Sequence, residues 1–397
     1  MERSLTDAAG RALDPLAESP ERAEFRRELR RLIERESPPE RIRELDEAAS
    51  FDRELHQSLA RMGVLALGAP EHLGGAGDVR DQVVAIEELA AGPTSMAAFL
   101  ILQYMAIQVL SPAEDGEPLR VLRELVGGGC KVSFAMSEPG GGTDAARAMR
   151  TRAEAVSGGY RIRGQKLWIT AASLADWILL LARSADFERS PVDGVTLFLL
   201  PAGADGIRVR DIDTFGLHSV PTCEIFLDDV FAPREAVLGE PGRGFRQVFG
   251  TLNRERLNAA AACLGVARAA LDYSVDYAGQ REAFGSPIGA FQSLQHRLAD
   301  GALALENARS LVVRAAEVEA GGGQADVLAT LAKLAASEAA AGITQGGMQL
   351  LAGAGFSREY PMQRWFRDVR LWHFAPVSDE MARNYLGERL LGLPRSY

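Results

Sequence analysis

The pattern of apolar residues changes from helical to β-type near Lys131 and back again near Pro233. Between these points short alternating runs are separated by glycine turns, whereas the flanking segments repeat apolar residues at intervals of three and four. This order predicts an α+β protein, mainly α, with three domains. They are an N-terminal helical domain (1–130), a small β domain of barrel or sandwich type (131–235) and a C-terminal four-helix bundle (236–397).

The flanking segments also carry signals for individual helices. Helices are predicted over residues 21–36, 52–62 and 83–90, with two more between 95 and 128, and residues 1–20 are predicted to form a mobile tail. Pro38 and Pro39 are expected to stop the first helix. In the bundle, Asp326 and Ser378 are expected to cap the third and fourth helices.

A strand followed by a glycine run opens the β segment. Residues 132–136 alternate at period two and lead into Gly140, Gly141 and Gly142. Three glycines remove the Cβ atoms that would keep a flat ligand away from the backbone, and they leave N–H groups to face it. Glu138, in the turn before the glycines, is expected to be structural.

A second strand faces this turn in the predicted fold. The hairpin signal at residues 157–159 returns the chain, and Lys166, Trp168 and Thr170 are expected to share one face of the new strand. A backbone shelf lined by glycine would then face an indole and a hydroxyl. This arrangement predicts a seat for a planar ring with polar edges.

Charge and cysteine content exclude several classes of function. The formal net charge of −10 provides no positive field to hold nucleic acid or anionic lipid. The three cysteines and five histidines are scattered outside metal-ligand spacing, so neither a disulfide framework nor a metal site is expected. We find neither a signal pattern nor an apolar run of membrane-spanning length, so no membrane association is predicted and a cytoplasmic location is expected.

The two motifs together resemble the signature of the acyl-CoA dehydrogenase family of flavoproteins. Ser-Glu-Pro-Gly-Gly-Gly-Thr-Asp at residues 137–144 is followed by Lys-Leu-Trp-Ile-Thr at 166–170. Further along, residues 281–285, 291–292 and 349–355 resemble the family segments that contact the FAD diphosphate and adenosine. Arginine pairs with a diphosphate through two parallel hydrogen bonds, and glycine lets the backbone approach it.

The resemblance implies FAD as cofactor and a set of contacts to it. These are Phe134, Met136, Ser137, Gly142, Thr143, Trp168, Ile169, Thr170, Arg281, Phe284, Gln292, Gln349, Gly353, Ser378 and Glu380. Thr143 and Arg256 are implied contacts to an acyl thioester carried by CoA or a carrier protein. Because the family's bundle contacts come partly from a neighbouring subunit, a homodimer or homotetramer is expected, with electron-transfer flavoprotein as the acceptor.

The catalytic base departs from the commonest family pattern. Many members place a glutamate after an Arg-Asp-Ala-Arg stretch, and register puts Pro376 at that position. In a second family arrangement the base is a glutamate of a Glu-Arg pair on the helix before the bundle. Glu255, followed by Arg256, stands at the matching point and is the candidate base.

Three functions remain open from the sequence. The first is an FAD-dependent acyl thioester dehydrogenase that forms an α,β-double bond with Glu255 as base. The second is a flavin monooxygenase of the same fold, which needs no α-proton base and is kept open by Pro376. The third is a redox-silent paralogue that serves as a partner subunit.

Overall fold

A computed structural model describes residues 18–187 and 189–396 and divides the chain into two compact units. The first unit contains the residues up to Glu44, Val79–Ala97 and the chain from Arg256 onward. The second unit contains Leu45–Asp78 and Ala98–Glu255. Each unit joins separate stretches of sequence, so the division into three consecutive domains remains a prediction. Most of the predicted N-terminal tail lies outside the described residues.

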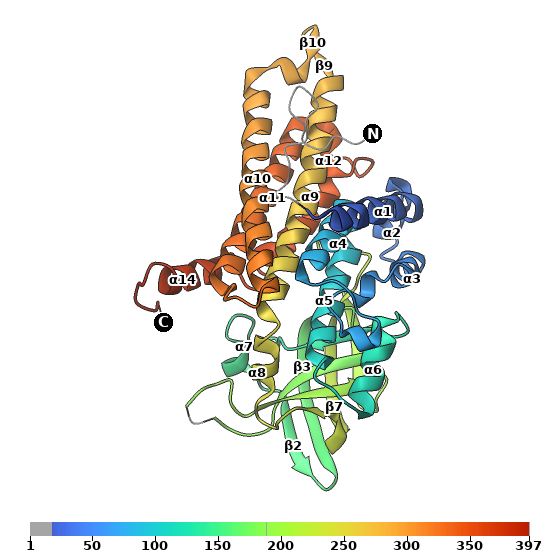
Figure 1. The fold of residues 1–397 in the computed structure, drawn as a ribbon, viewed down its shortest axis with the longest axis vertical. Coiled ribbons are helices and arrows are strands. Elements are labelled where there is room, and N and C mark those ends of the chain that lie inside the picture. Colours follow the sequence, from blue (N-terminus) through green and yellow to red (C-terminus); the bar gives the residue numbers. More distant parts are fainter. Residues whose placement is uncertain (1–17, 188, 397) are drawn as a thin grey trace. The chain divides into compact units, whose positions relative to one another are not determined.

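The first unit is helical apart from one small hairpin, β9 (Glu282–Ala283) with β10 (Ser286–Pro287) (Figure 1). Its helices, some of which extend past the unit boundary, are α1 (Pro20–Glu36), α2 (Pro39–Glu47), α4 (Val79–Ala91), α9 (Leu252–Gln280), α10 (Gln292–Ala320), α11 (Asp326–Leu351), α12 (Gly353–Phe356), α13 (Met362–Asp368) and α14 (Asp379–Arg389). Single 3₁₀ turns, η4 (Ile288–Ala290) and η5 (Val369–His373), precede α10 and follow α13.

The helix ends confirm some of the sequence signals and correct others. Ser378 caps α14, since its Oγ accepts a hydrogen bond from the backbone N–H of Met381 at 3.2 Å. Asp326 does not cap α11; the cap position is Ala325, and the Asp326 carboxylate accepts a hydrogen bond from Tyr385 instead. Helix α1 ends at Glu36, just before Pro38 and Pro39, as predicted. Pro39 also begins α2, a helix that the sequence did not predict, because proline suits the first helical position, where no N–H partner is needed.

Small residues let the bundle helices approach closely. A run of alanines from Ala259 to Ala262 is completely buried on α9. One turn further, a Cβ on Gly265 would lie 2.1 Å from the carbonyl oxygen of Glu87 on α4. Glycine is therefore required at this crossing, and the backbone of α9 packs directly on α4.

A buried cluster of charges joins four helices of this unit. Glu87 and Glu88 on α4 are almost fully buried. Four arginines from α1, α9 and α10 pair with them: Arg26, Arg30, Arg268 and Arg309. Burial alone would raise the pKa of Glu88, but Arg268, Arg30 and Arg26 lower it to about 2. Arg26 and Arg30 of α1 therefore turn inward, toward the two buried glutamates.

Helix α11 corrects the expectation that no segment is long enough to cross a membrane. Its 26 residues meet that criterion by length and composition. The apolar residues face other helices of the bundle, and 56% of the most apolar window is buried inside the protein. A core helix passes the same test, so this feature is weak evidence for a membrane span.

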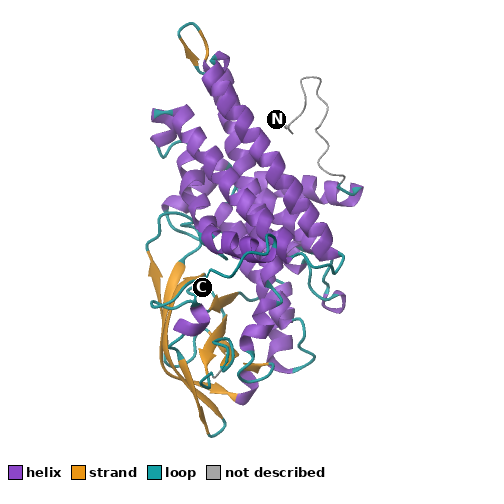
Figure 2. Cartoon of the chain, turned by 90° about the vertical axis from the view of Figure 1, so that its left-hand side faces the viewer, coloured by secondary structure: helices purple, strands orange, loops and turns teal. Residues whose placement is uncertain are grey.

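The second unit combines helices with one eight-stranded sheet, drawn as arrows in Figure 2. Its strands are β1 (Val132–Ala135), β2 (Arg152–Val156), β3 (Gly159–Thr170), β4 (Trp177–Arg183), β5 (Val195–Pro201), β6 (Ile207–Ile212), β7 (Thr222–Pro233) and β8 (Val237–Leu238). They are ordered β6-β7-β3-β2-β4-β5-β8, and β1 pairs with β4 in parallel. The helices are α3 (Arg53–Arg61), α5 (Thr94–Leu110), α6 (Gly116–Val126), α7 (Ala145–Ala148) and α8 (Gly244–Phe249), with 3₁₀ turns η1 (Val64–Ala66), η2 (Glu71–Leu73) and η3 (Arg234–Ala236).

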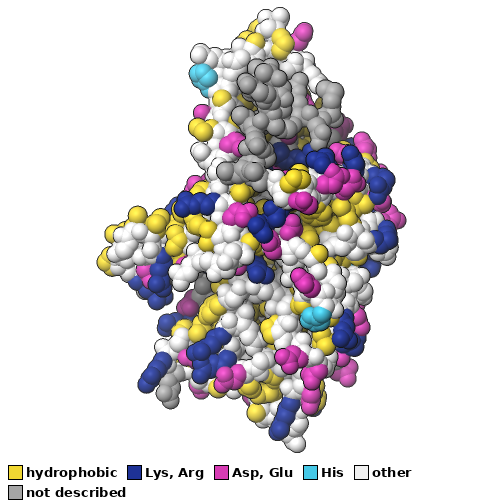
Figure 3. All heavy atoms as spheres, in the orientation of Figure 1, with side chains coloured by type: hydrophobic (Ala, Val, Ile, Leu, Met, Phe, Trp, Pro, Cys, Tyr) yellow, Lys and Arg dark blue, Asp and Glu magenta, His cyan; other side chains and the backbone are white. Residues whose placement is uncertain are grey.

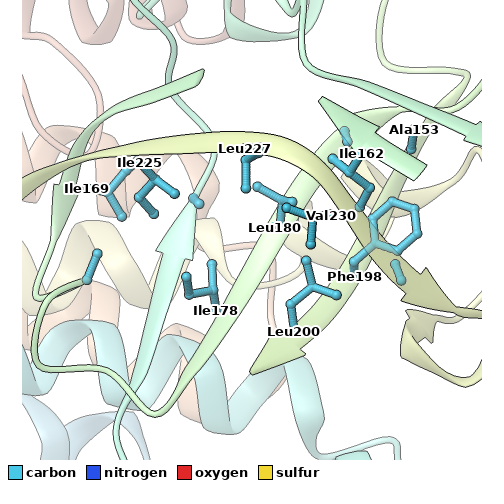
Figure 4. Close-up of a cluster of buried hydrophobic side chains, with 14 of the residues drawn as sticks. Ala153, Ile162, Ile169, Ile178, Leu180, Phe198, Leu200, Ile225, Leu227 and Val230 are labelled. Atoms are coloured by element: carbon cyan, nitrogen blue, oxygen red, sulfur yellow. The ribbon is translucent and has the colours of Figure 1, made fainter. Parts of the chain in front are cut away.

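The sheet encloses an apolar core that its alternating strands supply. Ile162, Leu180, Phe198 and Ile225 come from four different strands and are completely buried at its centre (Figure 4). The hairpin predicted at residues 157–159 is present, with Val156 opposite Gly159. These strands fix the ends of β1 and β3, where the two sequence motifs lie. The fold class predicted from the sequence, α+β and mainly α, is confirmed.

The exposed charges are mixed in sign. Figure 3 shows dark blue and magenta side chains interleaved around α1, where Arg27 pairs with Glu24 and Arg31 with Glu28. Pairs of this kind on an exposed helix contribute little to stability.

Candidate active site

The glycine turn follows strand β1 and is closed by its own backbone. Glu138 and Gly141 exchange hydrogen bonds with N–O distances of 3.3 and 3.1 Å. A Cβ on Gly141 would lie 2.2 Å from the Cβ of Ala148, whereas a Cβ on Gly142 would meet nothing within 4 Å. Gly141 is therefore required for packing against α7, and the open backbone expected of the glycine run lies at Gly142 and Gly140.

Lys166 of β3 is completely buried and holds this turn. Its ammonium donates to the carbonyl oxygen of Met136 at 3.0 Å and to Glu138 Oε1 at 2.8 Å. The Glu138 carboxylate also accepts from the backbone N–H groups of Arg150 (2.6 Å) and Thr151 (3.1 Å). Burial lowers the pKa of Lys166 to about 8. Burial would raise the pKa of Glu138, but Lys166 and the hydrogen bonds lower it. Glu138 is structural, as expected.

Trp168 does not share a face with Lys166, so that prediction is wrong. The pairing of β3 with β7 shifts between Lys166 and Ile169, and Trp168 has a φ of 64°. This bulge breaks the alternation of the strand. As a result Lys166 is buried, the Trp168 indole is 60% exposed and Ile169 returns to the core.

Two hydrogen bonds bring the motifs together. The Leu167 N–H donates to the carbonyl oxygen of Ser137 at 2.9 Å, and the Ser133 hydroxyl donates to that of Thr170 at 2.8 Å. The end of β1 therefore lies beside the residues around Trp168. The predicted FAD contacts collected here, which we call the β3 shelf, are Phe134, Met136, Ser137, Gly142, Thr143, Trp168, Ile169 and Thr170. The side chain of Ile169 is in the core, so only its backbone is available as a contact.

The β3 shelf fits the flat ring system of a flavin. A tryptophan in the left-handed region costs on the order of 1–3 kcal/mol, and such strain is concentrated at ligand sites. At Trp168 this backbone conformation turns the indole to solvent, so its aromatic face is not packed in the protein core. Gly142 leaves open backbone in the same turn, and Thr143 is exposed.

The predicted contacts to the remainder of FAD lie in the first unit and are exposed. Arg281 directly precedes β9, Phe284 lies in the turn between β9 and β10, and Gln292 begins α10. Phe284 has a φ of 53°, and its ring is 99% exposed. Gln349 lies near the end of α11, where Gly353 begins α12, and a Cβ on Gly353 would meet nothing within 4 Å. An arginine and open glycine backbone suit a diphosphate.

The loop that carries Pro376 connects η5 to α14. Ser378 caps α14, and Glu380 is exposed in its first turn. Lys333 of α11 is completely buried and donates to the carbonyl oxygen of Val377 at 2.8 Å and to Asp379 Oδ1 at 2.7 Å. The loop is therefore tied to α11 by a buried lysine, as the glycine turn is tied to β3.

Glu255 and Arg256 occupy the start of α9. The N–H of Glu255 donates to the carbonyl oxygen of Thr251 at 3.0 Å, and its side chain is half-buried. Gln108 of α5 donates to the carbonyl oxygen of Gly250 at 3.0 Å and so fixes the break between α8 and α9. The guanidinium carbon of Arg256 lies over the ring of Tyr385, 5.9 Å from the ring centroid. The Glu-Arg pair thus opens a bundle helix rather than ending a separate helix before it.

Sequence reasoning missed Lys333, His373 and Asp379. The available signal was Lys333 itself, a single charge within the apolar repeat of residues 327–336. Lysine is almost never fully buried without a partner, so its position predicts a buried acid. Nothing in the local pattern identifies Asp379 as that acid. Among the described residues no group of three or more histidine, cysteine or acidic side chains could hold a metal ion.

Comparison with known proteins agrees with these motifs. The chain matches the acyl-CoA dehydrogenase N-terminal domain over residues 19–115, the middle domain over 133–230 and the C-terminal domain over 242–391. It is 39% identical over 333 residues to benzylmalonyl-CoA dehydrogenase from Aromatoleum aromaticum, covering 82% of this chain and 86% of the relative.

Solved structures show the same similarity in three dimensions. Butyryl-CoA dehydrogenase from Megasphaera elsdenii is 31% identical, with a TM-score of 0.88 over 95% of this chain and 99% of that one. The FAD complex of PigA is 25% identical, with a TM-score of 0.88 over the same shares of the two chains. As its glycine turn and tryptophan strand predict, this chain belongs to the acyl-CoA dehydrogenase family of FAD-dependent oxidoreductases.

Proposed function

We propose that the protein forms an α,β-double bond in an acyl thioester and that Glu255 is its catalytic base. One observation carries this proposal: the usual position of the base holds no acidic side chain, and a glutamate stands at the family's second position for the base. Pro376, at the usual base register, has no proton-accepting side chain, whereas Glu255 is half-buried on a helix start fixed by Gln108.

The β3 shelf is the proposed contact surface for the isoalloxazine ring, with Trp168 against its face. Arg281, Phe284, Gln292, Gln349 and Gly353 are proposed to contact the diphosphate and adenosine, and Ser378 and Glu380 are also proposed contacts. Bound FAD would supply an acceptor for the β-hydrogen and both electrons of its C–H bond.

The residues of this chain supply the proton chemistry. The Glu255 carboxylate accepts the α-proton, and the electrons of that C–H bond form the new double bond. Arg256 is proposed to contact the thioester tail, and Thr143 to contact the substrate. Removal of the α-proton without loss of the hydride would leave an unstable enolate, so substrate orientation is essential.

Substitution of the base tests this mechanism. Glu255→Gln keeps the shape of the side chain but removes the proton acceptor, and we expect flavin bleaching by acyl-CoA to slow by at least about 100-fold while FAD is retained. The assay is anaerobic stopped-flow absorbance with butyryl-, glutaryl- and benzylmalonyl-CoA and with acyl-carrier thioesters. Glu240→Gln, an exposed glutamate of the same unit, is the control. Unchanged bleaching in Glu255→Gln would refute the assignment.

Pro376 also supports the monooxygenase alternative. In that case acyl thioesters would leave the flavin oxidised, and bleaching would require NAD(P)H with a reductase, followed by oxygen consumption. A colourless protein that no thioester changes would instead indicate a partner subunit without redox activity.

The proposed electron acceptor, oligomeric state and location of the enzyme follow from the same resemblance. Electron-transfer flavoprotein is the proposed acceptor, a homodimer or homotetramer the proposed assembly, and the cytoplasm the proposed location. Sedimentation of the holoenzyme and turnover with electron-transfer flavoprotein test the first two directly.

A further inference from the structure

The loop of residues 374–377 is fixed at both ends by one buried carboxylate. Asp379 follows the loop, and its Oδ2 lies 2.6 Å from Nδ1 of His373, the residue before the loop. Its Oδ1 accepts from Lys333 at 2.7 Å and from Ser337 at 3.0 Å, both on α11. The same Lys333 ammonium reaches back to the carbonyl oxygen of Val377.

The direction of the bond between His373 and Asp379 is settled by charge. Burial would raise the pKa of Asp379, but Lys333, His373 and Ser337 lower it, so the carboxylate is ionised and can only accept. His373 therefore donates its Nδ1–H. Its Nε2 is buried and makes no hydrogen bond within the described part of the chain. The bond to Asp379 is thus the polar contact that orients the ring.

Burial of the loop's own aromatic side chain does not hold it in place. Phe374, directly after His373, is 60% exposed. The start of the loop is held by the N–H groups of Phe374 and Ala375, which donate to the carbonyl oxygen of Leu371. Its end is held by the hydrogen bonds of Lys333 and of the His373–Asp379 pair. Networks of this kind restrict geometry more strongly in a buried site than in water.

We propose that His373 is a positioning residue for FAD: through Asp379 and Lys333 it fixes the loop so that Ser378 and Glu380 are preorganised to contact the cofactor. Ser378 and Glu380 are the residues directly before and after Asp379 in the chain, so a displacement of Asp379 moves both. The inference rests on the proposed FAD contacts of these two residues and is independent of the role of Glu255.

Three variants of the full-length holoprotein separate this role from simple stabilisation. His373→Leu removes the donor, and His373→Gln keeps an N–H that can reach the carboxylate. Ser337→Ala removes a different donor to the same carboxylate without touching the loop. The measurements are the rate of FAD release after dilution, followed by flavin fluorescence, the visible flavin spectrum and the melting temperature.

We expect His373→Leu to release FAD at least about tenfold faster and to shift the flavin spectrum. His373→Gln should restore most of the retention, and Ser337→Ala should release FAD at a rate close to that of the unmodified protein even if its melting temperature falls. The proposal is overturned if His373→Leu keeps normal release and spectrum, or if Ser337→Ala matches His373→Leu. Unchanged bleaching in Glu255→Gln would refute the base and leave this result standing.

Discussion

Each unit of the molecule contains one completely buried lysine, and the two are used in the same way. Lys166 pairs with Glu138 at 2.8 Å and also bonds the Met136 carbonyl. Lys333 pairs with Asp379 at 2.7 Å and bonds the Val377 carbonyl. In both cases the lysine ties a rigid element to a turn or loop that contains proposed FAD contacts or directly precedes them. An aromatic residue near each pair in the sequence, Trp168 or Phe374, is 60% exposed.

The two pairs differ in the other donors to the carboxylate. Glu138 also accepts from two backbone N–H groups, whose positions are fixed by the chain. Asp379 instead accepts from two side chains, Ser337 and His373, which can rotate. The N–O distances of the two ion pairs are nearly equal, so we expect the other donors to each carboxylate to determine how much stability is lost when the lysine is removed.

The largest effect is expected for Lys166→Met. This change leaves Glu138 buried without a counter-charge, which costs about 3–5 kcal/mol of the free energy of unfolding. Urea unfolding followed by circular dichroism measures the loss. Lys166→Met with Glu138→Gln removes both charges and should recover much of it. Equal losses in the single and double variants would show that Lys166 stabilises the turn by packing alone.

A smaller effect is expected for Lys333→Met. The two side-chain donors that remain, Ser337 and His373, can rotate toward the Asp379 carboxylate and limit the loss to about 1–3 kcal/mol of the free energy of unfolding. Urea unfolding measures the loss, with Lys166→Met as the reference variant. A loss in Lys333→Met as large as that in Lys166→Met would contradict the proposed difference between the pairs.

The smallest effects on stability are expected at the two exposed rings. Trp168→Gly relieves the left-handed backbone but adds freedom to the unfolded chain, so the net change should be within about 1 kcal/mol. Phe374→Ala should change stability by no more than about 0.5 kcal/mol. Thermal unfolding of the apoprotein measures both. If Trp168→Gly destabilised the apoprotein by several kcal/mol, the indole would be a structural residue rather than a ligand surface.

Local periodicity and motifs were sufficient for much of the fold. The strand patterns around Leu180 and Phe198 produced β4 and β5, and the helical repeats produced the long bundle helices. The Ser378 cap was also predictable, because capping depends on neighbouring residues in the chain. The end of α1 before Pro38 was predictable too, whereas Asp326 was misread because aspartate is compatible with the cap and with the first turn of a helix.

The sequence by itself determined the order of helical and β segments, the family and its cofactor, because these depend on short-range spacing and on motifs that are contiguous in the chain. Only the tertiary structure decided that Trp168 turns outward at a bulge, that Arg26 turns inward to the Glu87–Glu88 pair, and that Lys333 meets Asp379 across 46 residues. The physical reason is that a buried charge is tolerable only beside a partner, and the folded packing of distant segments determines which partner it meets.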